Sequence, residues 1–272
     1  MGATHILDEL MLKIFRADKH IRDFEEDCEK TKRQFINSIS FKDDEKTGDR
    51  SYYLGNAGFI DDMISLVVGD ALHNLRCALD HLAHHLVRIG TKSPGPFDDV
   101  CFPIGNTLTN YEDRLRKIIG RLEKCAVGRI NAIEPYKGGK GHDLWILRRL
   151  DDVDKHRVKL SANCTNLFHT MPPSQRKDIA EKFLGLPADA PIPSGKRFMT
   201  SSEGVHLLSL KGGEDLCTVP KAEVEGEMDF TFDITFDEPG VIEGESVRVT
   251  LHRMSDLVRG IIHDFDCRGL LA

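Results

Sequence analysis

The chain has 272 residues, of which 40% are hydrophobic and 30% are charged, and its formal net charge at pH 7 is −7. This length is enough to bury the core of one large domain or two small ones. The acidic balance argues against a protein that coats nucleic acid, although it allows a local basic groove, and we expect no DNA partner. No apolar run approaches the roughly 20 residues that span a bilayer, so we expect no membrane association.

The amino-terminal residues MGATHILDEL show no basic-then-apolar signal pattern, and the seven cysteines show no paired CxxC spacing. Both features predict a cytoplasmic protein with reduced thiols.

The first half of the sequence predicts long amphipathic helices, because apolar residues recur there at helical spacing. The expected helices cover residues 5–37, 59–89, 108–125 and 143–157, with Thr107 or Thr109 as N-cap of the third. The other face of the first helix is heavily charged, and we expect that face to be solvated. Between the first two helices, residues 52–54 predict a short strand.

After residue 157 the pattern changes to strands. The expected strands cover residues 158–164, 205–210 and 228–236, and the segment from residue 247 is expected to begin as a strand and end as a helix. Residues 171–195 are bracketed by prolines and predict an insertion with one short helix. The sequence thus predicts an α+β fold, a helical bundle with a small antiparallel sheet from the carboxy-terminal half. We expect a helical domain over 1–160 and a sheet with a carboxy-terminal helix over 161–272, packed together as one unit.

Residues 69–86, GDALHNLRCALDHLAHHL, place leucines on one arc of the second helix and polar residues on the other. The polar arc contains Asp70, His73, Asn74, Cys77, Asp80, His81, His84, His85 and Arg88. Within it, His73, Cys77, His81 and His85 follow one another at i, i+4 spacing, so neighbouring Cβ atoms lie about 5–6 Å apart. The arc is either a site on one helix face or a polar helix surface.

A second polar cluster lies in LDDVDKHR on the fourth expected helix. Asp151 and Asp154 are i, i+3 neighbours, and Lys155 and His156 follow where the helix ends and where its dipole favours cations. Both clusters lie on leucine-rich helices, so we predict that the polar arc of the second helix faces the fourth helix.

GDALHNLRCALDHLA, CFPI and LWILRRLDDVDKHR, in this order, resemble an uncharacterised bacterial family with the motifs HNLRxALDHL and LDxxDKHR over roughly residues 5–160. In that family Ser is common at the position of Cys77, and an aromatic residue often replaces His85. This weakens the hypothesis that the residues at i, i+4 spacing along the helix bind a metal ion. The matching polar residues are Asp70, His73, Asn74, Arg76, Asp80, His81, Asp151, Asp154, Lys155 and His156. The family brings no known activity.

The stretch is also distantly similar to HEPN ribonucleases, whose active helix carries Arg and, four to six residues on, His. Arg76 and His81 fit that spacing, with Asn74 just ahead. The resemblance implies a metal-independent endoribonuclease of toxin or defence type, a homodimer that acts on RNA without a cofactor. His81 would act on the ribose 2′-OH, and Arg76 would stabilise the phosphate charge. The wider set of candidate catalytic residues is Arg76, His81, Asn74, His73, Asp80, Asp151, Asp154, Lys155 and His156.

Two alternatives stay open beside this ribonuclease hypothesis, and the sequence does not decide whether the protein is an enzyme. In the first, His73, Cys77 or His81 holds one divalent transition metal such as zinc, iron or manganese, together with Asp151 or Asp154. In the second, the protein is a non-catalytic scaffold. Its helix register would then be fixed by a buried ion network of Arg76, Asp80, Asp151 and Asp154.

Overall fold

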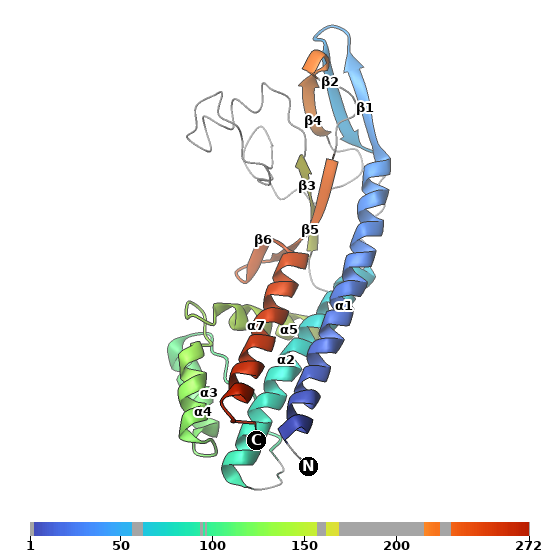
Figure 1. Cartoon of the computed structure of the whole chain (residues 1–272). Helices are drawn as coiled ribbons and strands as arrows, with labels where there is room; N and C mark the ends of the chain where they lie inside the picture. The colour runs from blue at the N-terminus through green and yellow to red at the C-terminus, as the bar shows by residue number, and fades with distance from the viewer. Residues whose placement is uncertain are drawn as a thin grey trace. The chain divides into compact units, whose positions relative to one another are not determined.

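The computed structural model describes residues 3–55, 62–92, 95, 97–156, 162–168, 215–223 and 230–271. Over these residues the chain is mostly helical and carries two small antiparallel sheets, which confirms the α+β prediction (Figure 1). The helices are α1 Ala3–Ser38, α2 Asp62–Thr91, α3 Leu108–Ile119, α4 Lys124–Ile133, α5 His142–His156 and α7 Val247–Cys267. The strands are β1 Ile39–Asp44, β2 Asp49–Leu54, β3 Ala162–Phe168, β4 Asp215–Pro220, β5 Phe230–Glu238 and β6 Ile242–Ser246.

The chain forms two compact units, each assembled from separate segments of the sequence. The first unit contains Met1–Glu26, Asp62–Ser161 and Phe236–Ala272, and the second contains Asp27–Asp61 and Ala162–Thr235. This division differs from the expected boundary at residue 160. The reason is that the carboxy-terminal helix α7 packs with the amino-terminal helices, whereas part of the amino-terminal half forms strands of the second unit.

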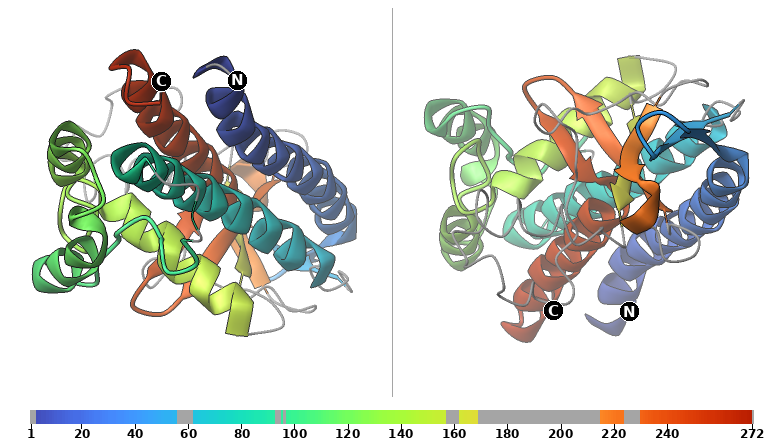
Figure 2. Two further views of the ribbon diagram at one scale, coloured as in Figure 1. Left: turned by 90° about the horizontal axis from the view of Figure 1, so that it is seen from below. Right: turned by 90° about the horizontal axis from the view of Figure 1, so that it is seen from above.

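The first unit is a helical bundle around α2. The first part of α1 lies beside α2 and α7, α5 runs across α2, and α3 and α4 lie on the far side of α2 from α1 (Figures 1 and 2). The predicted leucine arc of α2 supplies the centre of this core. Its buried members are Leu72, Leu75, Leu79, Leu82 and Leu86. Since apolar burial is the main stabilising contribution, this arc fixes which way the polar side of α2 must point.

Hydrogen bonds tie α1 to α7 within the first unit. Asp18 accepts bonds of 2.6 Å from both the Ser255 hydroxyl and the Arg259 guanidinium. The imidazole Nε2 of His252 lies 3.0 Å from Glu25 Oε1.

The sheet of the second unit has the strand order β1-β2-β4, with antiparallel neighbours throughout. The expected strand over 52–54 is the end of β2, and its partner β1 was not predicted. Asp43 on β1 binds both Arg50 on β2 and Lys221 just after β4. These two cations hold the pKa of Asp43 well below its usual range. The other sheet has the order β3-β5-β6.

Two expectations about secondary structure need correction. The helix expected over 108–125 ends at Ile119, and a separate helix, α4, begins at Lys124. β3 begins at Ala162, and the first residues of the strand expected over 158–164 lie outside the described residues. The segment from Val247 is helical from its first residue, because Ser246 caps it by accepting a hydrogen bond from the Val249 backbone N–H, and the strand β6 lies before the cap. The expected strand over 205–210 and the insertion over 171–195 lie outside the described residues.

Candidate functional site

The polar side chains of α2 point in three directions rather than toward one partner. His73 faces α5, where its imidazole Nδ1 lies 2.9 Å from Asp151 Oδ1. Asn74 and His81 face α1 and line a groove between the two helices. Arg76 contacts the segment that precedes α3. The prediction that the polar arc faces α5 therefore holds for one part of the arc only.

His73 lies between a buried carboxylate and a thiol. Asp151 is 1% exposed, and its carboxylate contacts His73 Nδ1, while the other ring nitrogen, Nε2, lies 3.4 Å from Cys77 Sγ. The imidazole itself stays about half exposed, at 48%. The sequence predicted that α2 and α5 share polar contacts, and this pair brings together His73, Cys77 and Asp151.

Asp154 lies one turn further along α5, against the backbone of α2 at Gly69. A Cβ atom at position 69 would overlap the Asp154 carboxylate, so the glycine leaves room for this side chain against α2. The backbone of Lys155 and His156 ends α5, and their side chains lie outside the described residues.

Arg76 and Asp80 bind the backbone of the CFPI segment. The Arg76 guanidinium is 2.8 Å from the Asp80 carboxylate and donates a hydrogen bond of 3.2 Å to the Phe102 carbonyl. The backbone N–H of Phe102 in turn donates to Asp80 at 2.8 Å. Arg148 of α5 donates to the Ile104 carbonyl of the same segment. Arg76 is only 6% exposed, and this arrangement fixes the segment on α2.

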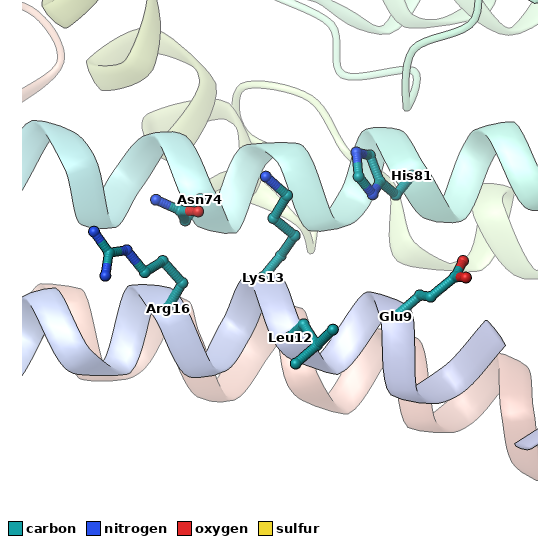
Figure 3. Close-up of a pocket in the computed structure, with 6 residues that line it drawn as sticks. All are labelled: Glu9, Leu12, Lys13, Arg16, Asn74 and His81. Atoms are coloured by element: carbon teal, nitrogen blue, oxygen red, sulfur yellow. The ribbon is translucent and has the colours of Figure 1, made fainter. Parts of the chain in front are cut away.

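The groove between α1 and α2 has a volume of about 380 Å³. Figure 3 shows its lining, in which the long side chains of α1 extend toward Asn74 and His81 on α2. The residues that line it are Glu9, Leu12, Lys13, Arg16, Asn74 and His81. Two cations and one carboxylate give the groove a net positive charge in an acidic protein.

His81 is exposed in this groove and has a lowered pKa. Partial burial of the ring lowers the pKa most, and the nearby Lys13 ammonium lowers it further, against opposing effects of Asp80 and Glu9. A lowered pKa keeps the imidazole neutral at pH 7, so that one ring nitrogen has a free lone pair to accept a proton.

Arg76 and His81 do not meet in one site within this chain. Five residues along a helix correspond to a rotation of about 140°, which directs the two side chains to different sides of α2. Arg76 is buried against the CFPI segment, and His81 lines the α1–α2 groove.

The cations of the groove were not predicted from the sequence. Lys13 and Arg16 belong to the α1 face that was expected to be solvated, and they lie at helical spacing with Glu9. This i, i+4, i+7 spacing of charged residues was the available signal, but the sequence does not tell which helix packs beside such a face.

A metal site is not assembled among the described residues, where no three His, Cys, Asp or Glu side chains are grouped so as to hold an ion. His73 and Cys77 are close enough to share one, but His81, the third ligand of the metal hypothesis, lines the groove on the α1 side.

The chain matches no protein-family model, no curated protein and no solved structure. The likenesses to the HNLRxALDHL family and to HEPN ribonucleases therefore stay predictions. Among the helices that the structure describes, none combines the length and the apolar character that a bilayer crossing requires.

Proposed function

We propose that the α1–α2 groove binds the phosphodiester backbone of RNA and that His81 is the general base of a metal-independent endoribonuclease. The observation that carries the proposal is an exposed imidazole with a lowered pKa, next to Lys13 and Arg16 in one groove. A general base works best when it is neutral at the working pH, and lysine and arginine are the side chains that bind phosphate.

In this reaction the neutral imidazole of His81 takes the proton of a ribose 2′-OH. The 2′ oxygen attacks the adjacent phosphorus, and the 5′ oxygen leaves with a proton from solvent. The products are a 2′,3′-cyclic phosphate and a 5′-hydroxyl end. Lys13 and Arg16 stabilise the negative charge that builds up on the phosphate oxygens. This assignment keeps His81 from the HEPN likeness but gives the phosphate-binding role to α1, because Arg76 is buried in its ion pair.

The test is cleavage of a fluorescently labelled single-stranded RNA in the presence of EDTA. We expect wild type to cleave it and to leave cyclic phosphate ends, and His81→Gln to lose about 10²- to 10⁴-fold in rate. The melting temperature of His81→Gln should stay within a few degrees, because the side chain is exposed. Lys13→Ala should weaken RNA binding and reduce its salt dependence.

His252→Gln is the matched control, since His252 is also an exposed helical histidine beside a glutamate, Glu25. It should cleave at the wild-type rate. Activity that survives in His81→Gln, or that requires an added divalent metal, would refute the proposal. The HEPN likeness further predicts a homodimer, which light scattering of the purified protein tests.

A non-catalytic scaffold is a second candidate, and it has an observation of its own. Arg76 and Asp80 bind backbone groups of Phe102 and so fix a loop on α2, which is the role expected of a structural ion pair. In the scaffold hypothesis purified wild type cleaves no RNA, whereas Arg76 substitutions still destabilise the fold.

A further inference from the structure

On the α5 side of α2, three side chains form a chain of contacts. Asp151 contacts His73 Nδ1 at 2.9 Å, and Cys77 Sγ contacts His73 Nε2 at 3.4 Å. A nucleophile next to a base, with the base oriented by a third group, is the arrangement that activates serine and cysteine nucleophiles. We infer that Cys77 is a nucleophilic thiol with His73 as its base, and that its substrate class is small hydroperoxides.

The buried carboxylate determines what each nitrogen of His73 can do. Asp151 is 1% exposed, and its ionised carboxylate only accepts hydrogen bonds, so the neutral ring places its proton on Nδ1. Nε2 is then a proton acceptor facing the Cys77 thiol. When it takes the thiol proton, the imidazolium lies between a carboxylate and a thiolate, both of which stabilise it. Asp151 acts through His73 and is a positioning residue.

The site is open to small molecules. Cys77 is partly exposed and His73 is about half exposed, in contrast to Cys28, which is 2% exposed in the core. Cys77 and His73 lie one turn apart within the long helix α2, so the helix itself fixes their spacing.

The position of Cys77 in α2 favours a hydroperoxide over an acyl substrate. Acyl transfer needs hydrogen-bond donors aimed at the developing oxyanion, and backbone N–H groups in the interior of a helix already donate within the helix. Reduction of a hydroperoxide needs only a thiolate, a path to the peroxide oxygen and a proton for the leaving group. Metal binding would need a third ligand, and the described residues supply none.

The step balances with the hydroperoxide as the oxidant. The Cys77 thiolate attacks one peroxide oxygen, the O–O bond breaks, and an S–O bond forms. The sulfur is oxidised to a sulfenic acid, and the hydroperoxide is reduced to an alkoxide. The alkoxide takes the proton from His73 Nε2 and leaves as the alcohol, so that the ring is neutral again.

The first experiment compares cysteines within the same molecule. Wild type is treated with one equivalent of hydrogen peroxide at pH 7, sulfenic acid is trapped with dimedone, and each cysteine is followed by peptide mass spectrometry. Cys125 is the internal reference, because it is exposed and its thiol contacts a carboxylate, Glu123, rather than an imidazole. We expect Cys77 to react at least tenfold faster than Cys125. Equal rates would overturn the proposal.

The second experiment tests the base. In His73→Gln the rate at Cys77 should fall to within about threefold of Cys125, whereas the matched His252→Gln should leave it unchanged. The pH profile of iodoacetamide alkylation at Cys77 should rise below the ordinary thiol pKa of about 8.5 in wild type and return to that value in His73→Gln. A wild-type profile that already follows the ordinary value would overturn the proposal.

Three further measurements test the role of Asp151 and two other uses of His73 and Cys77. Asp151→Asn should slow the reaction at Cys77 while the circular-dichroism spectrum stays native. If this variant does not fold, the His73→Gln variant alone decides whether the thiol of Cys77 is activated by His73. Addition of Zn²⁺ should not protect Cys77 from alkylation, and stoichiometric protection at micromolar Zn²⁺ would refute the nucleophile and indicate a metal site. Hydrolysis of p-nitrophenyl acetate that depends on Cys77 would refute the substrate class.

Discussion

Replacing Arg76 by alanine should destabilise the protein far more than removing an exposed arginine. The guanidinium is 6% exposed, and the substitution removes its contacts with the Asp80 carboxylate and the Phe102 carbonyl. Removing one partner of a buried ion pair costs about 3–5 kcal/mol. Asp80 keeps 28% of its side chain exposed, so water can partly replace the guanidinium, and Arg76 Nη1 has no hydrogen-bond partner among the described residues. Both facts favour a loss of stability at the lower end of this range, about 3 kcal/mol.

Urea unfolding followed by circular dichroism measures this difference, with Arg116→Ala as the control. Arg116 also pairs with an aspartate, at 2.7 Å from Asp113, but the two side chains are 72% and 55% exposed. Exposed pairs contribute about 0–1 kcal/mol, so the control should shift the midpoint only slightly. The double variant Arg76→Ala/Asp80→Ala should cost less than the sum of the single variants, because each single change already breaks the pair. If Arg76→Ala and Arg116→Ala have the same effect, the buried network does not hold the CFPI segment.

Two more predictions concern helix contacts. Burial lowers the pKa of both His20 and His85 below the ordinary value of 6.5, and a nearby cation, Arg16 for His20 and Arg88 for His85, lowers it further. As the pH falls, these histidines therefore take up protons in the unfolded chain before they do so in the folded protein. The contribution of the two neutral histidines to the free energy of unfolding should therefore be fully present above about pH 7. It should fall as the pH drops through 6.5, by up to about 1.4 kcal/mol per pH unit for each histidine. Melting temperatures from pH 7.5 to 5.5 measure this, and a flat profile would contradict it. Gly69→Ala should destabilise through overlap with Asp154, whereas Gly260→Ala, with open space around it, should stabilise α7 by up to about 1 kcal/mol. Equal stabilisation by both changes in thermal melts would refute close α2–α5 packing at Gly69.

The parts of the fold that follow from local periodicity could be predicted, and those that depend on partners could not. The leucines of α2 repeat at helical spacing, and all five are buried as expected. The break between α3 and α4 depends on the turn after Gly120, and apolar periodicity does not reveal it. The start of α7 was mistaken for a strand because Val247 and Val249 are β-branched, but the capping hydroxyl of Ser246 and the apolar face of the helix outweigh that preference.

The candidate site shows the same limit. The sequence singled out His73, Cys77, His81 and Asp151, but it treated the first three as one arc that faces the helix of Asp151. In the structure His81 lines a groove with α1, whereas His73 and Cys77 face the α5 side. Which neighbouring helix each polar residue contacts depends on the order in which the helices pack around α2. This order cannot be predicted from the residue spacing within any one helix.

The contacts of α1 with α7 constrain how the protein is made on the ribosome. Asp18 binds Ser255 and Arg259, so α1 cannot complete its packing until α7 has been synthesised. At about 5–20 residues per second, the chain between Glu26 and Val247 takes on the order of ten to forty seconds to emerge. During that time the buried face of α1, with Leu10 and Ile14, lacks one of its final neighbours. We therefore expect the nascent chain to bind chaperones that recognise exposed apolar helices, and truncation within α7 to yield an aggregation-prone product.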